Sequence, residues 1–210
     1  MNGKFMISYD VESLFTNIPL NESIDLTILY ILKGNSDVKL TADELSTLFH
    51  FATVQPTANL FLGHYENIWL DFNYNSSLAH LYHRGCVDDT FCSFSSEDEA
   101  DQNFYFINSR HPNIKFTFEK ELDHKISFLD VLVDNSLATP VISVFRKNTY
   151  TGLLTNFFSF VPFCYKIGLI RTLLDRTYRI NNTWSGFNSD IQKVFNILRK
   201  IVFLCISLKD

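Results

Sequence analysis

The sequence predicts an α+β fold in which helices pack on small antiparallel sheets. Three observations support this class. The 210 residues are 46% hydrophobic and 15% aromatic, which is enough to bury a sizeable core. Short β-branched and aromatic segments separated by turn residues are typical of antiparallel strands. Longer amphipathic segments are typical of helices, and they follow the strands without the regular βαβ alternation of a parallel sheet.

The first third of the chain predicts one strand and three helices. In chain order we expect a strand at residues 5–9, ending at Asp10, and helices at 22–33, 41–51 and 59–70. Asn21 is the expected N-cap of the first helix. Thr41 and Glu44 have the spacing of a capping box at the start of the second.

The rest of the chain alternates between extended and helical segments. We expect a strand, a tight turn and a second strand over residues 81–94, and then a helix capped by Ser96 that runs to about residue 109. Further on we expect extended segments at 114–120, 126–133 and 141–147, followed by helices at about 163–179 and 186–200. The last two helices are separated by Asn181 and Asn182.

The charge is divided unevenly along the chain. Residues 1–137 carry 8 Lys and Arg against 20 Asp and Glu, whereas residues 138–210 carry 10 against 3, and the whole chain has a net charge of -5. An acidic body beside a basic end suggests that the first binds cations and the second an anionic partner. A chance run of solvated cations is the alternative.

The cysteines and the apolar runs exclude several classes of protein. The four cysteines form no Cys-x-x-Cys pair and have no histidine at zinc-ligand spacing, so we expect neither a structural zinc site nor a disulfide partner. No apolar run is long enough to span a bilayer, and the first residues lack the apolar core of a secretory signal. We therefore expect an intracellular protein, nuclear or cytoplasmic, without a membrane partner.

Asp88 and Asp89 stand between two strand-like runs, where a two-residue hairpin turn normally carries Asn-Gly or Asp-Gly. Two adjacent carboxylates repel each other unless a divalent cation lies against them. Asp10, at the end of another strand, is a candidate third ligand. Two metal ions held by such carboxylates can activate an attacking hydroxyl and stabilise the leaving oxygen of a phosphoryl transfer. An ordinary exposed turn is the alternative.

Longer motifs surround these aspartates. Residues 8–19, SYDVESLFTNIP, resemble the first palm motif of reverse transcriptases, and residues 82–91, YHRGCVDDTF, resemble their Val-Asp-Asp hairpin motif. Three downstream segments are similar to the Penelope-like retroelement branch: SRHPNIKFT at 109–117, FLDVL at 128–132 and TGLLTNF at 151–157. The resemblance covers nearly the whole chain.

The resemblance implies an RNA-directed DNA polymerase with a role for several residues. Asp10 and Asp88 would be the principal ligands of two Mg²⁺ or Mn²⁺ ions, with help from the Val11 carbonyl. Asp89 would be a weaker member of this catalytic set. Phe15 matches the bulky position that excludes a ribose 2′-hydroxyl and so favours deoxynucleotides, with an ordinary core phenylalanine as the alternative.

The resemblance also implies domains and partners. Residues 1–137 would be a partial palm, and residues 138–210 the end of the palm and a basic, helical, thumb-like region. The partners would be an RNA template, a DNA primer and deoxynucleoside triphosphates. Residues 128–130 resemble the hairpin that grips the primer, with a core strand as the alternative.

Two departures from the family pattern predict a weak or inactive polymerase. The second palm motif normally has a Gly-Ser-Pro core, but residues 51–63, FATVQPTANLFLG, lack it near position 53. That loop positions the template and the incoming base, so its loss costs orientation. The chain also begins just before the first palm motif, so we expect no fingers to clamp a triphosphate.

The basic C-terminal third interleaves cations with aromatic residues, as a surface that binds nucleic acid does. The candidate contacts are Arg146, Lys147, Lys166, Arg171, Arg176 and Arg179, with Tyr150, Tyr165, Tyr178 and Trp184 as stacking residues. A solvated basic face over core aromatics is the alternative. The last two helices also have the order of a helix-turn-helix, although most helical hairpins enter no DNA groove.

Three hypotheses follow. The first is an impaired reverse transcriptase fragment, the second a non-catalytic nucleic-acid-binding module with a helix-turn-helix-like end, and the third a retroelement fragment without a function of its own.

Overall fold

The chain divides into two compact units in the computed structural model, which describes residues 4–34, 38–51, 54–74 and 82–200. The N-terminal unit comprises residues 3–121 and the C-terminal unit residues 122–210. Both contain helices and small antiparallel sheets, so the predicted α+β class is confirmed. The boundary between the units lies before the charge change at 137/138.

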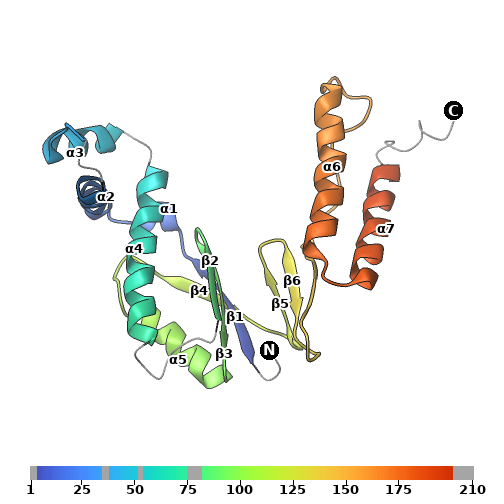
Figure 1. Cartoon of the computed structure of the whole chain (residues 1–210), viewed down its shortest axis with the longest axis horizontal. Helices are drawn as coiled ribbons and strands as arrows, with labels where there is room; N and C mark the ends of the chain where they lie inside the picture. The colour runs from blue at the N-terminus through green and yellow to red at the C-terminus, as the bar shows by residue number, and fades with distance from the viewer. Residues whose placement is uncertain (1–3, 35–37, 52–53, 75–81, 201–210) are drawn as a thin grey trace. The chain divides into compact units, whose positions relative to one another are not determined.

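The N-terminal unit is built on a four-stranded antiparallel sheet with the order β2-β3-β1-β4 (Figure 1). Its strands are β1 (Phe5–Val11), β2 (Tyr82–Cys86), β3 (Asp89–Phe94) and β4 (Phe116–Lys120). Its helices are α1 (Leu14–Asn17), α2 (Leu20–Gly34), α3 (Ala42–Phe51), α4 (Val54–Tyr74) and α5 (Glu97–Asn108). The first strand in sequence therefore lies inside the sheet, with strands from much later in the chain on both sides.

Alternation along β1 gives the sheet two different faces. Tyr9 and Val11 point into a core with Phe61 of α4 and Ile107 of α5, so helices cover that face. Successive side chains of a strand point to opposite sides. Asp10, between two core residues, is therefore exposed on the other face.

The predicted caps of two helices are confirmed. The Thr41 N–H donates to Glu44 Oε2 at 2.8 Å while the Glu44 N–H donates to Thr41 Oγ1 at 3.3 Å, which is the reciprocal pattern of a capping box. The Ser96 hydroxyl accepts a hydrogen bond from the Glu99 N–H at the start of α5. These caps were predictable because both partners lie within three residues of each other.

Two helix starts were predicted wrongly. Asn21 is not the N-cap of α2, because the helix starts at Leu20 and the Ser23 N–H already donates to the Pro19 carbonyl at 3.0 Å. Helix α4 starts at Val54 rather than at Asn59, and it carries Pro56 in its first turn. A proline is tolerated there because a first-turn N–H has no partner within the helix.

The C-terminal unit combines a three-stranded meander with a helical hairpin. Strands β5 (Lys125–Phe128), β6 (Val131–Asp134) and β7 (Val141–Val144) pair in sequence order, and α6 (Phe163–Ile180) and α7 (Trp184–Lys200) follow. The expected single strand at 126–133 is wrong. Leu129 takes a positive φ of 53° and turns the chain, so that Phe128 pairs with Val131 across a tight hairpin.

The two helices of the hairpin pack lengthwise. Val194 and Leu198 of α7 are buried against Leu169, Ile170, Leu173 and Leu174 of α6. Only one side of each helix contributes to this core, because the buried positions of α7 recur every four residues. The opposite side of α7 is left to solvent.

Polar side chains join the hairpin to the edge strand β7. The Asn182 side chain accepts from the Ile142 N–H at 2.9 Å and donates to the Pro140 carbonyl at 2.8 Å. Asp190, which is 2% exposed, accepts from the Arg146 guanidinium at 2.6 Å, from Asn181 at 3.0 Å and from the Val144 N–H at 3.4 Å. These bonds occupy strand-edge donors that another strand would otherwise bind.

We expect Asp190→Ala to destabilise the C-terminal unit by about 3 kcal/mol, because it leaves a half-buried guanidinium without its partner. Urea unfolding followed by circular dichroism, with amide hydrogen exchange along α6 and α7, measures the loss. Asp175→Ala is the matched control, since it removes an exposed pair with Arg179 and should leave both readouts unchanged. Equal effects of the two variants would contradict this role for Asp190.

Candidate functional site

The hairpin of β2 and β3, called the aspartate hairpin, does not turn at Asp88 and Asp89 as expected. Cys86 pairs with Asp89, so the two turn residues are Val87 and Asp88, and Asp89 is the first residue of β3. Val87 takes a φ of 60°, a left-handed conformation that is unfavourable for a β-branched side chain. The hairpin therefore positions Asp88 at its tip on a strained backbone.

Strand pairing brings two aspartates from distant parts of the sequence together in the sheet. Asp10 of β1 is the cross-strand partner of Asp89 of β3, and directly opposite residues of an antiparallel pair share one face. The Asp10 carbonyl also accepts a hydrogen bond from the Thr117 hydroxyl of β4 at 3.4 Å. The sheet thus places Asp10 between the aspartate hairpin and β4.

The negative charges around Asp10 repel one another. Burial, and then the negative charge of Asp88, raise the pKa of Asp10, while a hydrogen bond from the Val11 N–H acts in the other direction and Glu119 adds to the rise. A carboxyl whose pKa rises beside another carboxylate gains from a nearby cation.

Asp10 and Asp88 therefore fit a shared divalent cation, which prefers carboxylate oxygens. Among the residues that the structure describes, no three His, Cys, Asp or Glu side chains lie together as a metal-binding group. Asp10 and Asp88 are therefore candidate donors for a cation, and Asp89 lies opposite Asp10 in the β1–β3 pair. Val11 lies beside them on β1.

Phe15 follows β1 in the sequence and belongs to the short helix α1. Its neighbour Leu14 is 3% exposed and belongs to the core, whereas Phe15 is 40% exposed. An ordinary core phenylalanine is therefore the wrong interpretation of this position. The hydrogen bond from the Asn17 amide to the Glu12 carbonyl, at 2.9 Å, closes the turn that holds it.

A second carboxyl group near the hairpin was not predicted. Glu66 of α4 accepts a hydrogen bond from the Thr90 hydroxyl at 3.3 Å, and burial raises its pKa. It lines a pocket of about 390 Å³ between α4 and the aspartate hairpin, together with Asn59, Gly63, Asn67, His83, Gly85 and Val87. No sequence pattern indicated this role, because Glu66 looks like one more polar residue on an amphipathic helix.

Lys166 and Arg146, two of the expected nucleic-acid contacts, point into the C-terminal unit. Lys166 is 8% exposed, and its ammonium donates to the carbonyls of Phe157 and Ser159 at 2.5 and 2.7 Å. Arg146 is bound to buried Asp190. We therefore correct both assignments: these cations hold a loop and a helix in place, and Lys166 has no ammonium surface left for a phosphate.

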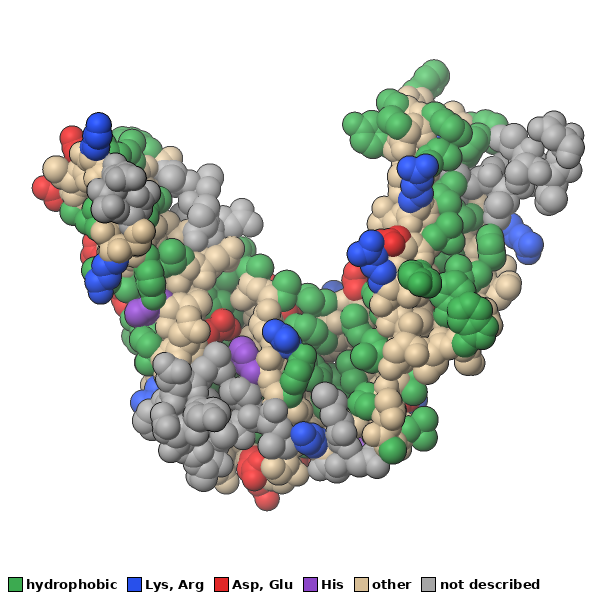
Figure 2. Space-filling model, in the orientation of Figure 1, with side chains coloured by type: hydrophobic (Ala, Val, Ile, Leu, Met, Phe, Trp, Pro, Cys, Tyr) green, Lys and Arg blue, Asp and Glu red, His purple; other side chains and the backbone are tan. Residues whose placement is uncertain are grey.

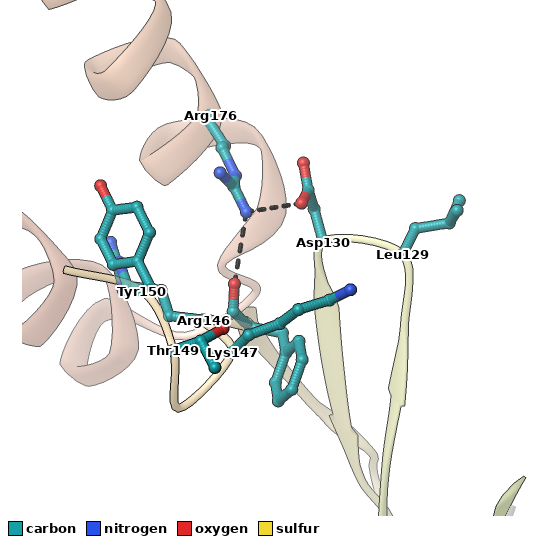
Figure 3. A pocket seen from close by; sticks show the side chains of 8 residues that line it. Leu129, Asp130, Arg146, Lys147, Thr149, Tyr150 and Arg176 are labelled. Carbon is teal, nitrogen blue, oxygen red and sulfur yellow. Dashed lines mark hydrogen bonds and ion pairs between the residues drawn. The ribbon is translucent and has the colours of Figure 1, made fainter. Parts of the chain in front are cut away.

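Arg176 and Lys147 line a pocket of about 260 Å³ beside the β5–β6 turn (Figure 3). Arg176 donates to Asp130 at 2.8 Å and to the Phe145 carbonyl at 3.3 Å, so its charge is partly balanced. Lys147 is exposed, and within the described residues it forms no ion pair. The hydroxyl-bearing residues Thr149 and Tyr150 complete the polar rim.

Other predicted contacts are exposed on the helical hairpin, where Figure 2 shows Lys and Arg side chains among hydrophobic ones. Arg171 is exposed, and Arg179 is exposed while paired with Asp175 on the same helix. The four candidate stacking residues are also exposed, by 42% at Tyr150, 68% at Tyr165, 71% at Tyr178 and 73% at Trp184. The alternative that these aromatics form core is therefore wrong.

Comparison with known families finds a match in the C-terminal part of the chain. Residues 153–201 are similar to the animal helix-turn-helix domain. The matched segment contains all of α6 and α7 and lies within the C-terminal unit. No curated protein matches the chain.

The described residues give two further observations. No helix among them combines the length and the apolar character that crossing a membrane requires. Cys86, Cys92 and Cys164 are free thiols. The fourth cysteine, and the gap expected near position 53 in the second palm motif, lie outside the described residues.

We expect Glu66→Gln to stabilise the protein increasingly as the pH rises above about 4.5. The folded protein holds a proton on Glu66 that the unfolded chain releases, so its contribution to stability is lost as the pH rises through the raised pKa. Gln keeps the hydrogen bond from Thr90 and cannot ionise. Urea unfolding between about pH 3.5 and about pH 7.5 measures the difference.

Glu44→Gln is the control with the opposite sign. Hydrogen bonds from the Thr41 backbone and side chain lower the pKa of Glu44, so its contribution is present above the unfolded pKa and is lost on acidification. That variant should lose more stability at neutral pH than at low pH. Parallel trends in the two variants would contradict the assignment for Glu66.

Proposed function

We propose that the N-terminal unit is the palm of a reverse transcriptase, with a site for metal-dependent nucleotidyl transfer, and that the C-terminal unit binds nucleic acid. The observation that carries the first part is the meeting of Asp10 with the tip of the aspartate hairpin, from segments far apart in the sequence. The motif resemblance of residues 8–19 and 82–91 supports it, since these two segments form adjacent strands.

Each residue has a defined task in this proposal. Asp10 and Asp88 hold Mg²⁺ or Mn²⁺ against the open face of the sheet. A bound cation supplies the positive charge that lowers the pKa of a primer 3′-hydroxyl and offsets the charge on the leaving oxygen. Phe15, exposed on α1, stands beside the incoming sugar and excludes a 2′-hydroxyl. Asp89 supports the other two from the first position of β3.

We expect only weak polymerase activity from this chain alone. The loop that orients the template and the incoming base in the second palm motif is shortened near position 53. Orientation accounts for a large share of the rate of a two-substrate reaction. Metal binding depends only on the carboxylates, so it survives this loss and is the more direct test of the site.

We expect Asp10→Asn and Asp88→Asn each to weaken Mn²⁺ binding at least about tenfold, and to abolish any primer extension on an RNA template, because each removes a charged ligand. Calorimetry or Mn²⁺ magnetic resonance measures the first effect and gel electrophoresis the second. Asp98→Asn, at an exposed aspartate of α5, is the control and should bind Mn²⁺ normally. Unchanged Mn²⁺ binding in both site variants would refute the metal site.

A second candidate function is a nucleic-acid-binding module without catalysis. The similarity of residues 153–201 to the animal helix-turn-helix domain favours it, as do exposed Arg171 and Lys147 and the exposed aromatics of the same unit. In this case the aspartate hairpin is a remnant, and binding does not depend on it.

We expect Lys147→Ala and Arg171→Ala each to weaken duplex binding and to reduce the slope of log K against log salt by about 0.9, the value for one lost phosphate contact. Fluorescence anisotropy over a salt series measures both effects. Lys125→Ala is the control, because this exposed lysine of the same unit is paired with Asp134. Binding that is insensitive to salt would contradict the phosphate contacts, and a chain that binds neither metal nor nucleic acid is a fragment without function.

A further inference from the structure

We propose that the pocket between α4 and the aspartate hairpin binds a guanidinium group, with the Glu66 carboxylate as its counter-ion. The pocket of about 390 Å³ lies wholly within the N-terminal unit. Residues of α4 line one side of it, and residues of β2 and the turn after β2 line the other (Figure 1). Such a site is separate from the aspartates proposed to hold a metal ion, and it is independent of both parts of the proposed function.

Both carboxylate oxygens of Glu66 face an open space beside Gly85. A methyl group on Gly85 would lie 3.9 Å from each of these oxygens and 3.7 Å from Thr90 Oγ1. A group placed there is equally close to the two oxygens, so it can bond to both at once. A guanidinium fits this arrangement, because its two parallel N–H donors match the two oxygens of a carboxylate. A compact ammonium has no such fork.

Among the residues that the structure describes, no cation pairs with Glu66. Its carboxylate accepts a hydrogen bond from the Thr90 hydroxyl and forms no ion pair there. Arg84 precedes Gly85 on β2, but neighbouring side chains of a strand point to opposite faces. The Arg84 guanidinium donates to the Tyr82 hydroxyl at 3.2 Å instead. Burial raises the pKa of Glu66, and a bound cation offsets the cost of ionising it.

Two amides complete a set of hydrogen-bond acceptors around the pocket. Asn59 and Asn67 line it from α4, and neither side chain bonds to another residue of the described chain. A guanidinium has five N–H donors and no acceptor, so the amide oxygens can take the donors that the carboxylate leaves unbonded. Val87 adds an apolar wall against which an alkyl stem can pack. The excess of 20 acidic over 8 basic residues in 1–137 also favours a cation here.

Two glycines give the pocket its space. Gly63 stands in the middle of α4, where glycine is a poorer helix former than alanine. No atom of the described residues lies within 4 Å of where a Gly63 methyl group would be, so packing does not require a glycine there. Neither Gly63 nor Gly85 takes a positive φ. An alanine at either position therefore removes free volume from the pocket without straining the backbone.

Titration of the intact chain with methylguanidinium tests the proposal, followed by amide nuclear magnetic resonance at about pH 8, where exposed carboxylates are ionised. We expect saturable shifts at Gly63 and Gly85, at ligand concentrations far below those that denature proteins. Methylurea has the same shape without the charge, and methylammonium has the charge without the fork. Each should bind about tenfold more weakly, because a bidentate, charge-assisted pair is lost.

Three substitutions locate the binding site. Glu66→Gln keeps an acceptor for Thr90 and removes the charge, so methylguanidinium should bind no better than methylurea does. Gly85→Ala should weaken methylguanidinium binding about tenfold, because the methyl group occupies the space in front of both oxygens. Gly63→Ala should weaken binding while raising the thermal midpoint, since alanine favours the helix.

Gly168→Ala is the matched control for the glycine variants. Gly168 lies in α6 of the other unit, and its methyl group would also meet no described atom within 4 Å. This variant should raise the thermal midpoint as Gly63→Ala does, and it should leave methylguanidinium binding unchanged. The comparison separates a change in the pocket from a change in helix stability.

A blocked arginine amide distinguishes two sources of the guanidinium. Tighter binding of this compound than of methylguanidinium, with weak binding of blocked citrulline amide, assigns the pocket to an arginine side chain of a peptide. Equal binding of both cations assigns it to a small free ligand. Asp10→Asn should lose Mn²⁺ and keep the methylguanidinium shifts, so failure of the metal site leaves this site standing. Absence of saturable shifts, equal binding of methylurea, or full binding by Glu66→Gln and Gly85→Ala would overturn the inference.

Discussion

The C-terminal unit depends on one buried carboxylate. Asp190 would be costly to bury alone, and burial by itself raises the pKa of its side chain. Hydrogen bonds from Arg146, Asn181 and Lys193 reverse that effect and lower the pKa below the ordinary value. These partners come from the segment after β7, the turn between the helices and α7 itself. The charge therefore connects the sheet, the turn and the last helix, and it determines which residues of α7 face solvent.

In the N-terminal unit, by contrast, negatively charged side chains lie close to one another instead of beside cations. Central placement of β1 puts Asp10 beside β3, and the tight turn at Val87 and Asp88 adds a second negative group. The helices on the other face supply the burial that holds this edge, through core residues such as Tyr9 and Phe61. The packed core on the other face holds these like charges close together despite their repulsion. The sheet therefore maintains an unfavourable contact that a bound cation can relieve.

Local signals in the sequence predicted what depends on neighbouring residues. The capping box at Thr41 and the N-cap at Ser96 were predictable because the two partners are three residues apart. Residue patterns did not predict the turn at Leu129, because leucine rarely adopts a positive φ, and only the motif resemblance of residues 128–130 indicated a hairpin there. The start of α4 was missed because Pro56 looks like a break, although the first turn of a helix accepts it.

The residues of the candidate sites also divide into those that the sequence predicted and those that only the folded chain reveals. Asp10 and Asp88 were found from motif resemblance, and the structure brings them near each other. Glu66 and the burial of Lys166 could not be predicted, since they depend on Thr90 and on the carbonyls of a loop that only the folded chain brings close. The solvent-facing side of α7 could not be predicted either, because it depends on which side Val194 and Leu198 bury.

The placement of the two tryptophans gives each unit its own optical signal. Trp69 is 6% exposed in the core of the N-terminal unit, whereas Trp184 is 73% exposed at the start of α7, with its ring stacked on Phe187. An indole in an apolar core and one in water emit at different wavelengths, so the fluorescence spectrum of the intact chain is the sum of two overlapping components. Unfolding of the N-terminal unit shifts the band of the buried indole. A ligand on α7 changes the other, and the two halves of the molecule can be followed at once without any label.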